Sequence, residues 1–224
     1  MSELRWVTFD CFGTLVDWRH GISTAAELLY PGRGAELLEA YNRHEPVIQT
    51  ETPTMRYREV MAEALRRATR DAGLDLVEDN AYVLGATIPY WPVFPDTRAA
   101  LAELRQADWR LALLTNCDRD LIAETRRRLG VPIDAVVTAE DVGAYKPSHD
   151  HFIRFERSFG VTRDRWVHVA QSWVHDMVPA SELRIPRIWV NRQLDGQDPS
   201  IADAVMPHLN GLLEAVEQVR GTAV

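Results

Sequence analysis

Hydrophobic and polar residues are arranged along the chain in a pattern that predicts alternating strands and helices. Short apolar runs without helical periodicity indicate buried strands, whereas apolar residues that recur every three or four positions indicate amphipathic helices. The predicted strands are roughly residues 6–9, 110–115, 135–138, 166–170 and 187–191. Helices are predicted in most of the other segments and in most of the tail from 200 to 220. This alternation is typical of an α/β fold with a mostly parallel sheet flanked by helices.

One long stretch, from Trp18 to about Trp91, shows helical periodicity and no strand signal. Its segment 54–72 carries apolar residues at spacings of three and four, which form one face of a helix: Tyr57, Met61, Ala64, Leu65 and Ala68. The first strand alone cannot form a core, so this stretch is predicted to be an insertion. We therefore expect an α/β core domain of residues 1–17 and 93–224, and an all-helical cap domain of residues 18–92. Asp96 is placed to cap the first helix after the insertion.

Composition narrows the classes of protein to which the chain can belong. The net charge of −8 and the pI of about 5.4 argue against nucleic acid or an anionic membrane as a partner. No apolar run approaches the roughly 20 residues that a membrane span needs, and Asp10 and Asp17 interrupt the first apolar stretch, unlike in a signal peptide. Cys11 and Cys117 have no spacing that indicates a metal site or a disulfide framework. We expect a cytoplasmic protein with buried thiols.

Polar side chains that can carry chemistry follow four of the predicted strands. Asp10 follows the first strand, Thr115 and Asn116 the second, Lys146 the third and Asp176 the fourth. Ligand sites of open parallel sheets lie at the carboxyl ends of the strands, so these loops should meet around one small cavity. A nucleophilic carboxylate must be ionised, and a nearby lysine lowers its pKa. We therefore expect a nucleophilic Asp10 beside Lys146 and Asp176, with Thr115 and Asn116 holding an anionic substrate.

These residues stand in four motifs, DCFGTLVDW, LLTN, YKP and HD, whose order and spacing resemble those of the haloacid dehalogenase-like hydrolases. The resemblance implies a Rossmann-like core with an inserted helical cap. Phosphatases of this superfamily have a second aspartate two residues after the nucleophile, which protonates the leaving group, and Phe12 occupies that place here. Halide leaves as a stable anion and needs no proton. The chain thus looks like the L-2-haloacid dehalogenase branch, which converts a small L-2-haloalkanoic acid to the 2-hydroxy acid through an aspartyl ester.

The same resemblance implies roles for individual residues. Asp10 would be the nucleophile, Lys146 would stabilise its charge, and Asp176 and Thr14 would support the site and the hydrolytic water. The substrate carboxylate would bind Thr115 and the backbone amides of Cys11 and Phe12, and the halide would lie between Asn116 and a cap arginine. The complete set of expected substrate-binding residues is Cys11, Phe12, Arg43, Thr115, Asn116, Ser172 and Trp173.

The chain departs from the dehalogenase pattern around the substrate. Counting along the motif places Asn42 on the cap arginine, and we choose its neighbour Arg43 for its charge. Gln171 and Trp173 replace a serine and an asparagine of the fourth motif, and Phe152 replaces a tyrosine.

These departures leave alternatives open: a related hydrolase of another small 2-substituted carboxylate, such as an azetidine-2-carboxylate ring opener, a magnesium-dependent small-molecule phosphatase, or a non-catalytic binding protein. We expect no cofactor and no metal unless the phosphatase alternative holds. The expected partner is a small carboxylate. Dimers are common in the family, so a homodimer is also an expectation.

Overall fold

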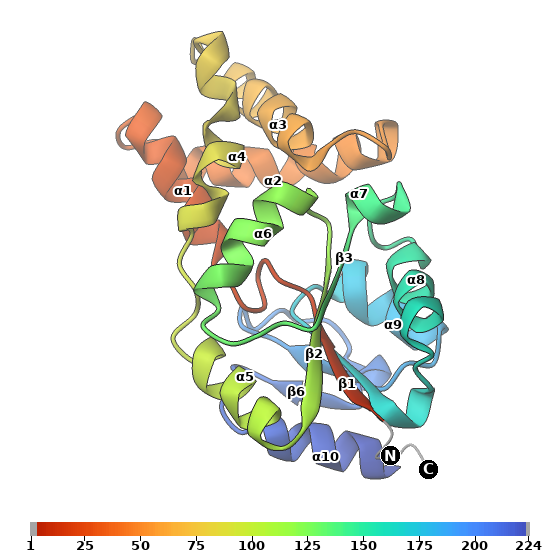
Figure 1. The fold of residues 1–224 in the computed structure, drawn as a ribbon. Helices are drawn as coiled ribbons and strands as arrows, with labels where there is room; N and C mark the ends of the chain where they lie inside the picture. Colours follow the sequence, from red (N-terminus) through yellow and green to blue (C-terminus); the bar gives the residue numbers. More distant parts are fainter. Residues whose placement is uncertain (1–3, 223–224) are drawn as a thin grey trace.

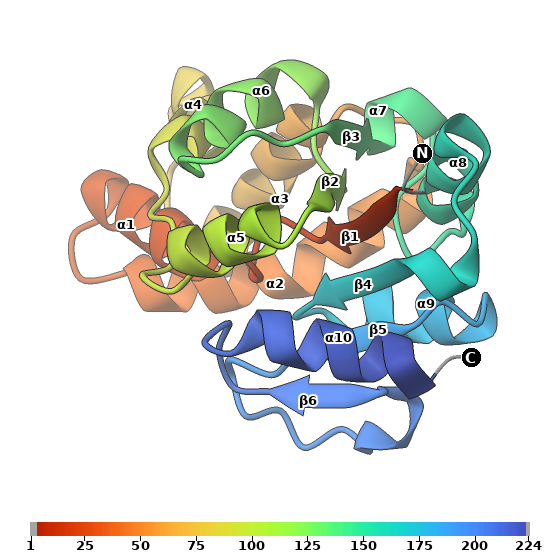
Figure 2. The ribbon, with the colours of Figure 1, turned by 60° about the horizontal axis from the view of Figure 1, so that its bottom comes forward.

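The computed structural model describes residues 4–222 and contains a six-stranded sheet in the order β3-β2-β1-β4-β5-β6, in which every neighbouring pair is parallel (Figures 1 and 2). The strands are β1 (Arg5–Phe9), β2 (Trp109–Thr115), β3 (Ala135–Thr138), β4 (Trp166–Ala170), β5 (Arg187–Val190) and β6 (Ala204–Met206). The predicted α/β fold, with a Rossmann-like sheet flanked by helices and a helical cap, is confirmed.

Side chains of the central strands alternate between two apolar layers, because successive residues of a strand point to opposite faces of the sheet. Val7 and Phe9 belong to the layer that includes α5 (Thr97–Gln106) and α10 (Leu212–Thr222), and Trp6 belongs to the opposite layer. Figure 2 shows α5 and α10 side by side across one face of the sheet. The other face packs against α8 (Asp150–Phe159) and α9 (Val178–Glu182). Burial on both faces explains why these strands read as continuous apolar runs.

The stretch predicted to be an insertion folds into helices that lie beyond the carboxyl edge of the sheet, together with two core helices, α6 (Arg119–Arg128) and α7 (Ala139–Val142) (Figure 1). Its helices are α1 (Trp18–Leu29), α2 (Gly34–Glu51), α3 (Tyr57–Asp71) and α4 (Val83–Thr87), with short 3-10 turns at 78–82 and 88–90. An antiparallel bridge between Val16 and Val93 lies where the chain leaves the core and returns to it. The limits of the two domains stay a prediction.

The remaining core helices are α6 (Arg119–Arg128), α7 (Ala139–Val142) and a π-helical turn at Trp173–Met177. Two predictions about local structure were wrong. The tail contains the edge strand β6, which is too short to show a period of its own and forms because β5 offers a free edge. Asp96 occupies the N-cap position of α5, but its side chain makes no capping hydrogen bond there, because its carboxylate instead accepts hydrogen bonds from Arg192 and from the amide of Leu209.

Within residues 4–222, no helix is both long and apolar enough to span a membrane. Cys11 and Cys117 are buried free thiols. Burial raises the pKa of both well above the usual value, so both are protonated at neutral pH.

Candidate active site

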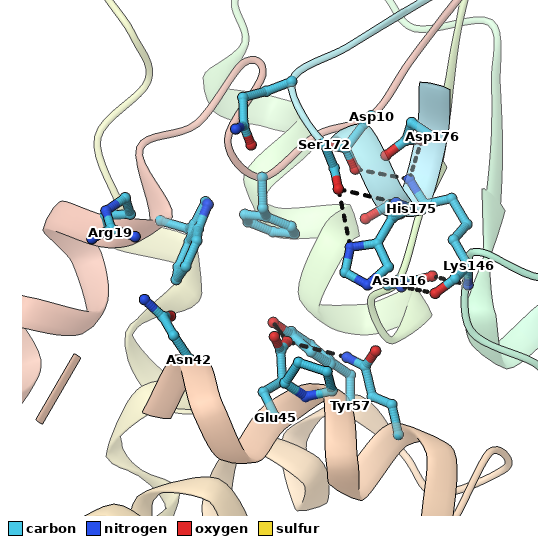
Figure 3. A pocket seen from close by; sticks show the side chains of 16 residues that line it. Asp10, Arg19, Asn42, Glu45, Tyr57, Asn116, Lys146, Ser172, His175 and Asp176 are labelled. Carbon is cyan, nitrogen blue, oxygen red and sulfur yellow. Dashed lines mark hydrogen bonds and ion pairs between the residues drawn. The ribbon is translucent and has the colours of Figure 1, made fainter. Parts of the chain in front are cut away.

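A cavity of about 300 Å³ lies between the carboxyl edge of the sheet and the cap helices (Figure 3). The structure brings to this cavity seven of the residues predicted from the sequence: Asp10, Phe12, Thr115, Asn116, Lys146, Ser172 and Asp176. They come from loops that follow β1, β2, β3 and β4, which is the convergence expected of parallel strands.

Lys146 is the centre of the charged cluster in this cavity. Its ammonium group donates to Asp10 Oδ1 at 2.9 Å, to Asp176 Oδ1 at 2.7 Å and to the carbonyl of Leu114 at 2.9 Å. These acceptors use its three N–H donors. Burial would lower the pKa of Lys146, but the charges of the two carboxylates outweigh burial and raise it. The lysine is therefore a fixed positive charge at neutral pH.

The two carboxylates that share this lysine differ in how firmly they hold their negative charge. Burial tends to raise the pKa of Asp176, yet the charge of Lys146 and a hydrogen bond with His168 lower it to about 2. For Asp10, burial is the largest effect, and together with the charge of Asp176 it raises the pKa above the usual value despite Lys146. Asp176 is thus ionised across the physiological range, and Asp10 is the carboxylate that protonates first as the pH falls.

The loop after β1 aims the Asp10 carboxylate. Thr14 donates its hydroxyl proton to Asp10 Oδ2 at 3.0 Å and accepts the amide proton of Gln171 at 2.9 Å. Gly13, which directly precedes Thr14 in this loop, has a φ of +102°, a conformation that favours glycine. Arg192, which sequence reasoning missed, donates twice to the carbonyl of Thr14, at 2.9 and 3.1 Å. The loop is therefore held from both the β4 and the β5 sides of the site.

Thr115 and Asn116, although adjacent, have different environments. The amide of Asn116 is engaged with the backbone of Lys146, because Oδ1 accepts from its N–H at 2.7 Å and Nδ2 donates to its carbonyl at 3.1 Å. Asn116 therefore positions the lysine loop. Thr115 is fully buried beside the cavity, and its hydroxyl has no hydrogen-bond partner within the described residues. A buried hydroxyl without a partner is unfavourable, so Thr115 is ready to bind a substrate oxygen.

Two predicted substrate-binding side chains do not reach the cavity. Arg43 is exposed on α2, where it bonds to the carbonyl of Glu39 at 3.3 Å and lies 3.8 Å from the carboxylate of Asp71. Trp173 packs on Trp189, with ring centroids 4.8 Å apart. Neighbours on a helix are about 100° apart, so only one of residues 42 and 43 can face the site, and the structure places Asn42 there. The Cys11 side chain is buried and does not line the cavity, and the substrate-binding role of its amide stays a prediction.

Sequence reasoning missed most of the cap side of the cavity. Asn42, Glu45 and Gln49 of α2 line it at spacings of three and four, together with Tyr57 at the start of α3. Figure 3 shows Asn42, Glu45 and Tyr57 of this group. That spacing is the signal that could have identified them, since residues three and four apart share one helix face.

Arg19 and His175 also line the cavity. The guanidinium group of Arg19 is paired with Glu39 at 2.7 Å. The imidazole of His175 lies 3.1 Å from the hydroxyl of Ser172, and burial lowers its pKa, which favours the neutral ring.

The chain matches a known family over most of its length. Residues 4–177 match the model of the haloacid dehalogenase-like hydrolases. An (S)-2-haloacid dehalogenase of Pseudomonas putida is 28% identical over 200 residues, which cover 86% of this chain and 88% of that protein. A haloacetate dehalogenase of Moraxella sp. is 28% identical over 203 residues, with the same two coverages.

Among solved structures, the L-2-haloacid dehalogenase from Xanthobacter autotrophicus with chloropropionic acid covalently bound has a TM-score of 0.82 with this chain, at 21% identity. The match covers 96% of this chain and 99% of that one, and it shows a shared fold. The family match spans well over half of the sequence and includes all four motif loops. This chain is a member of the haloacid dehalogenase-like hydrolases.

Proposed function

We propose that this protein is an (S)-2-haloacid dehalogenase, which converts a small L-2-haloalkanoic acid and water to the 2-hydroxy acid and halide. The observation that carries the proposal is the environment of Asp10. Its two oxygens are fixed by Lys146 and Thr14, and Phe12 stands where an acid would be needed to protonate a leaving group. Curated relatives that are 28% identical over 86% of the chain are named as dehalogenases.

In the first step, an oxygen of Asp10 attacks C2 of the substrate. The C2–halogen bond breaks, halide leaves with the bonding electron pair, and an ester forms between Asp10 and C2. Lys146 and Thr14 hold the Asp10 carboxylate in place. The nucleophile therefore meets C2 in a fixed orientation, which lowers the entropic part of the activation barrier. The free hydroxyl of Thr115 supplies a hydrogen bond to the substrate carboxylate.

In the second step, water attacks the carbonyl carbon of the ester, the bond from that carbon to the substrate oxygen breaks, and Asp10 is regenerated. The 2-hydroxy acid and one proton are released. Asp176 Oδ2 is buried next to the cavity and has no partner within the described residues, so it can accept a hydrogen bond from that water. Its low pKa keeps it ionised for this purpose.

We further propose that the reaction needs no resident metal. Lys146 supplies the positive charge between Asp10 and Asp176, at 2.9 and 2.7 Å from their nearest oxygens. Within the described residues, no group of three or more His, Cys, Asp or Glu side chains is arranged to hold a metal ion. The proposal predicts that activity survives treatment with a chelator.

The test is halide release from L- and D-2-chloropropionate in buffer that contains a chelator, with the Asp10→Asn protein as the control. The proposal predicts release from the L-form only, and none from the variant. Absence of release, combined with magnesium-dependent hydrolysis of p-nitrophenyl phosphate, would support the phosphatase alternative. Conversion of azetidine-2-carboxylate alone would support the ring-opening alternative.

A further inference from the structure

The cap wall of the cavity, formed by Asn42, Glu45, Gln49 and Tyr57, is polar and includes one acidic side chain, that of Glu45. Figure 3 shows Asn42, Glu45 and Tyr57 facing the core residues Asp10, Ser172 and His175 across the cavity. Glu45 Oε1 accepts the phenol proton of Tyr57 at 2.9 Å and an amide proton of Gln49 at 3.1 Å. Tyr57 and Gln49 thus each direct a donor at Glu45.

Two acceptor side chains of the cap wall, Asn42 and Glu45, have no cation beside them in the part of the chain that the structure describes. Asn42 Oδ1 is buried and has no hydrogen-bond partner within residues 4–222. Glu45 has no ion-pair partner among the described residues, and its acidic side chain lines the cavity. Burial raises the pKa of Glu45, although hydrogen bonds from Tyr57 and Tyr41 oppose the effect. The carboxylate of Glu45 is partly buried and hydrogen-bonded but has no cation beside it within the structure described, and a cation there would offset the cost of its partial burial.

The charges around the cavity also favour a positively charged group beside the cap wall. Asp10 and Asp176 share the single charge of Lys146, and the charge of Arg19 is directed at Glu39, which does not line the cavity. A substrate with only a carboxylate would add another negative charge to this surplus. A substrate with an ammonium group as well would add none and would supply donors to Glu45 and Asn42.

We propose that the cap wall is a subsite for an ammonium group, so that the protein selects 2-haloacids that also carry an amino group. This inference rests on the proposed function for its substrate class and assigns Glu45 as a specificity-determining residue. A suitable pair of substrates is 3-amino-2-chloropropionate and 2-chlorobutyrate, which differ only by an ammonium group in place of a methyl group. In both reactions the C2–Cl bond breaks, chloride leaves as the Asp10 ester forms, and hydrolysis of the ester consumes one water and releases the 2-hydroxy acid and a proton.

Binding tests the subsite without any chemistry. β-Alanine and butyrate also differ only by an ammonium group in place of a methyl group, and neither carries a leaving group. The wild-type protein should bind β-alanine at least about tenfold more tightly than butyrate in a calorimetric titration. Glu45→Gln should remove this preference while leaving butyrate binding within about twofold, and Asn42→Asp should increase it. Glu36→Gln, on the exposed face of the same helix where Glu36 pairs with Arg33, is the matched control and should change nothing.

Kinetics with the two chloro acids separates this inference from the proposed function. The wild-type protein should have the higher kcat/KM for 3-amino-2-chloropropionate, and Glu45→Gln should reverse the order. Equal turnover of both substrates, together with equal binding of β-alanine and butyrate, would overturn the subsite and leave the dehalogenase proposal standing. Selective binding of β-alanine without chloride release from either substrate would overturn the dehalogenase proposal and support the subsite. Loss of both ligands in Glu45→Gln would show that Glu45 only braces the cap wall.

Discussion

His168 of β4 holds the Asp176 carboxylate from inside the sheet: its Nε2 lies 3.0 Å from Asp176 Oδ1, and both side chains are fully buried. Its Nδ1 lies 2.9 Å from the hydroxyl of Thr8, the residue paired with it on β1, and Trp166 donates to that hydroxyl at 2.7 Å. Asp176 is ionised, and an ionised carboxylate can only accept hydrogen bonds. The imidazole therefore donates from Nε2 to Asp176.

From this relationship we predict a positioning role for His168. His168→Leu removes a donor to a buried charge, which is worth roughly 1.5–3 kcal/mol. If that loss is expressed in the hydrolytic step, kcat should fall about tenfold to a hundredfold with little change in KM. The measurement is steady-state kinetics across pH. His149→Gln, at an exposed histidine paired with Glu182, is the control. A variant of His168 that lost only thermal stability, with kcat and its pH profile intact, would contradict the role.

The pH dependence of catalysis should be set on its acid side by Asp10. Burial raises the pKa of this carboxyl group above the usual 3.8, and only the ionised form is nucleophilic. Activity should therefore be full at neutral pH and fall as the pH decreases through a value above 3.8. The acid limb of a plot of log kcat/KM against pH measures it. A profile that stayed flat to below pH 3.8 would show that Asp10 is not the group that must ionise.

Removing the charge of Lys146 should destabilise the fold as well as stop the reaction. Lys146→Met leaves the carboxylates of Asp10 and Asp176 buried without a cation, and breaking a buried ion pair in this way costs about 3–5 kcal/mol. Urea denaturation of this variant gives the cost. The double variant Lys146→Met/Asp176→Asn lacks one of the two charges and should recover part of the stability. No recovery in the double variant would mean that lost packing, and not electrostatics, causes the effect.

Arg192 should stabilise the nucleophile loop. It forms a nearly buried ion pair with Asp96 at 2.9 Å and donates to the carbonyl of Thr14. Arg192→Gln should lower the free energy of unfolding by about 3 kcal/mol, near the lower end for a broken buried pair. Arg127→Gln breaks an exposed pair with Glu124 and should cost less than about 1 kcal/mol. Equal costs in the two variants, measured by chemical denaturation, would refute this assignment.

The core side of the site could be predicted from the sequence because its residues follow strands, and the ends of parallel strands meet at one edge of the sheet. A motif does not show in the same way which face of a helix points into the site. Asp10 and Lys146 each follow a strand, so both were expected at the carboxyl edge of the sheet, where they form a hydrogen bond. The cap side depends on the rotation of α2 about its axis, which the sequence does not define well enough to separate Arg43 from Asn42. His168 was overlooked as a site residue because a polar residue within an apolar strand gives no sign of its partner, and Thr8 and Asp176 become its neighbours only when β1 and β4 pair.

The proposed reaction passes through an ester of Asp10 whose carbonyl carbon is attacked by water. A single turnover in water labelled with the heavy oxygen isotope, with protein in excess over L-2-chloropropionate, tests it most directly. Since the product takes its new oxygen from Asp10 in this mechanism, we expect an unlabelled 2-hydroxy acid and one heavy oxygen in the peptide that contains Asp10, both detectable by mass spectrometry. Labelled product and an unlabelled peptide in that first turnover would show that water attacks C2 directly, and would rule out the ester.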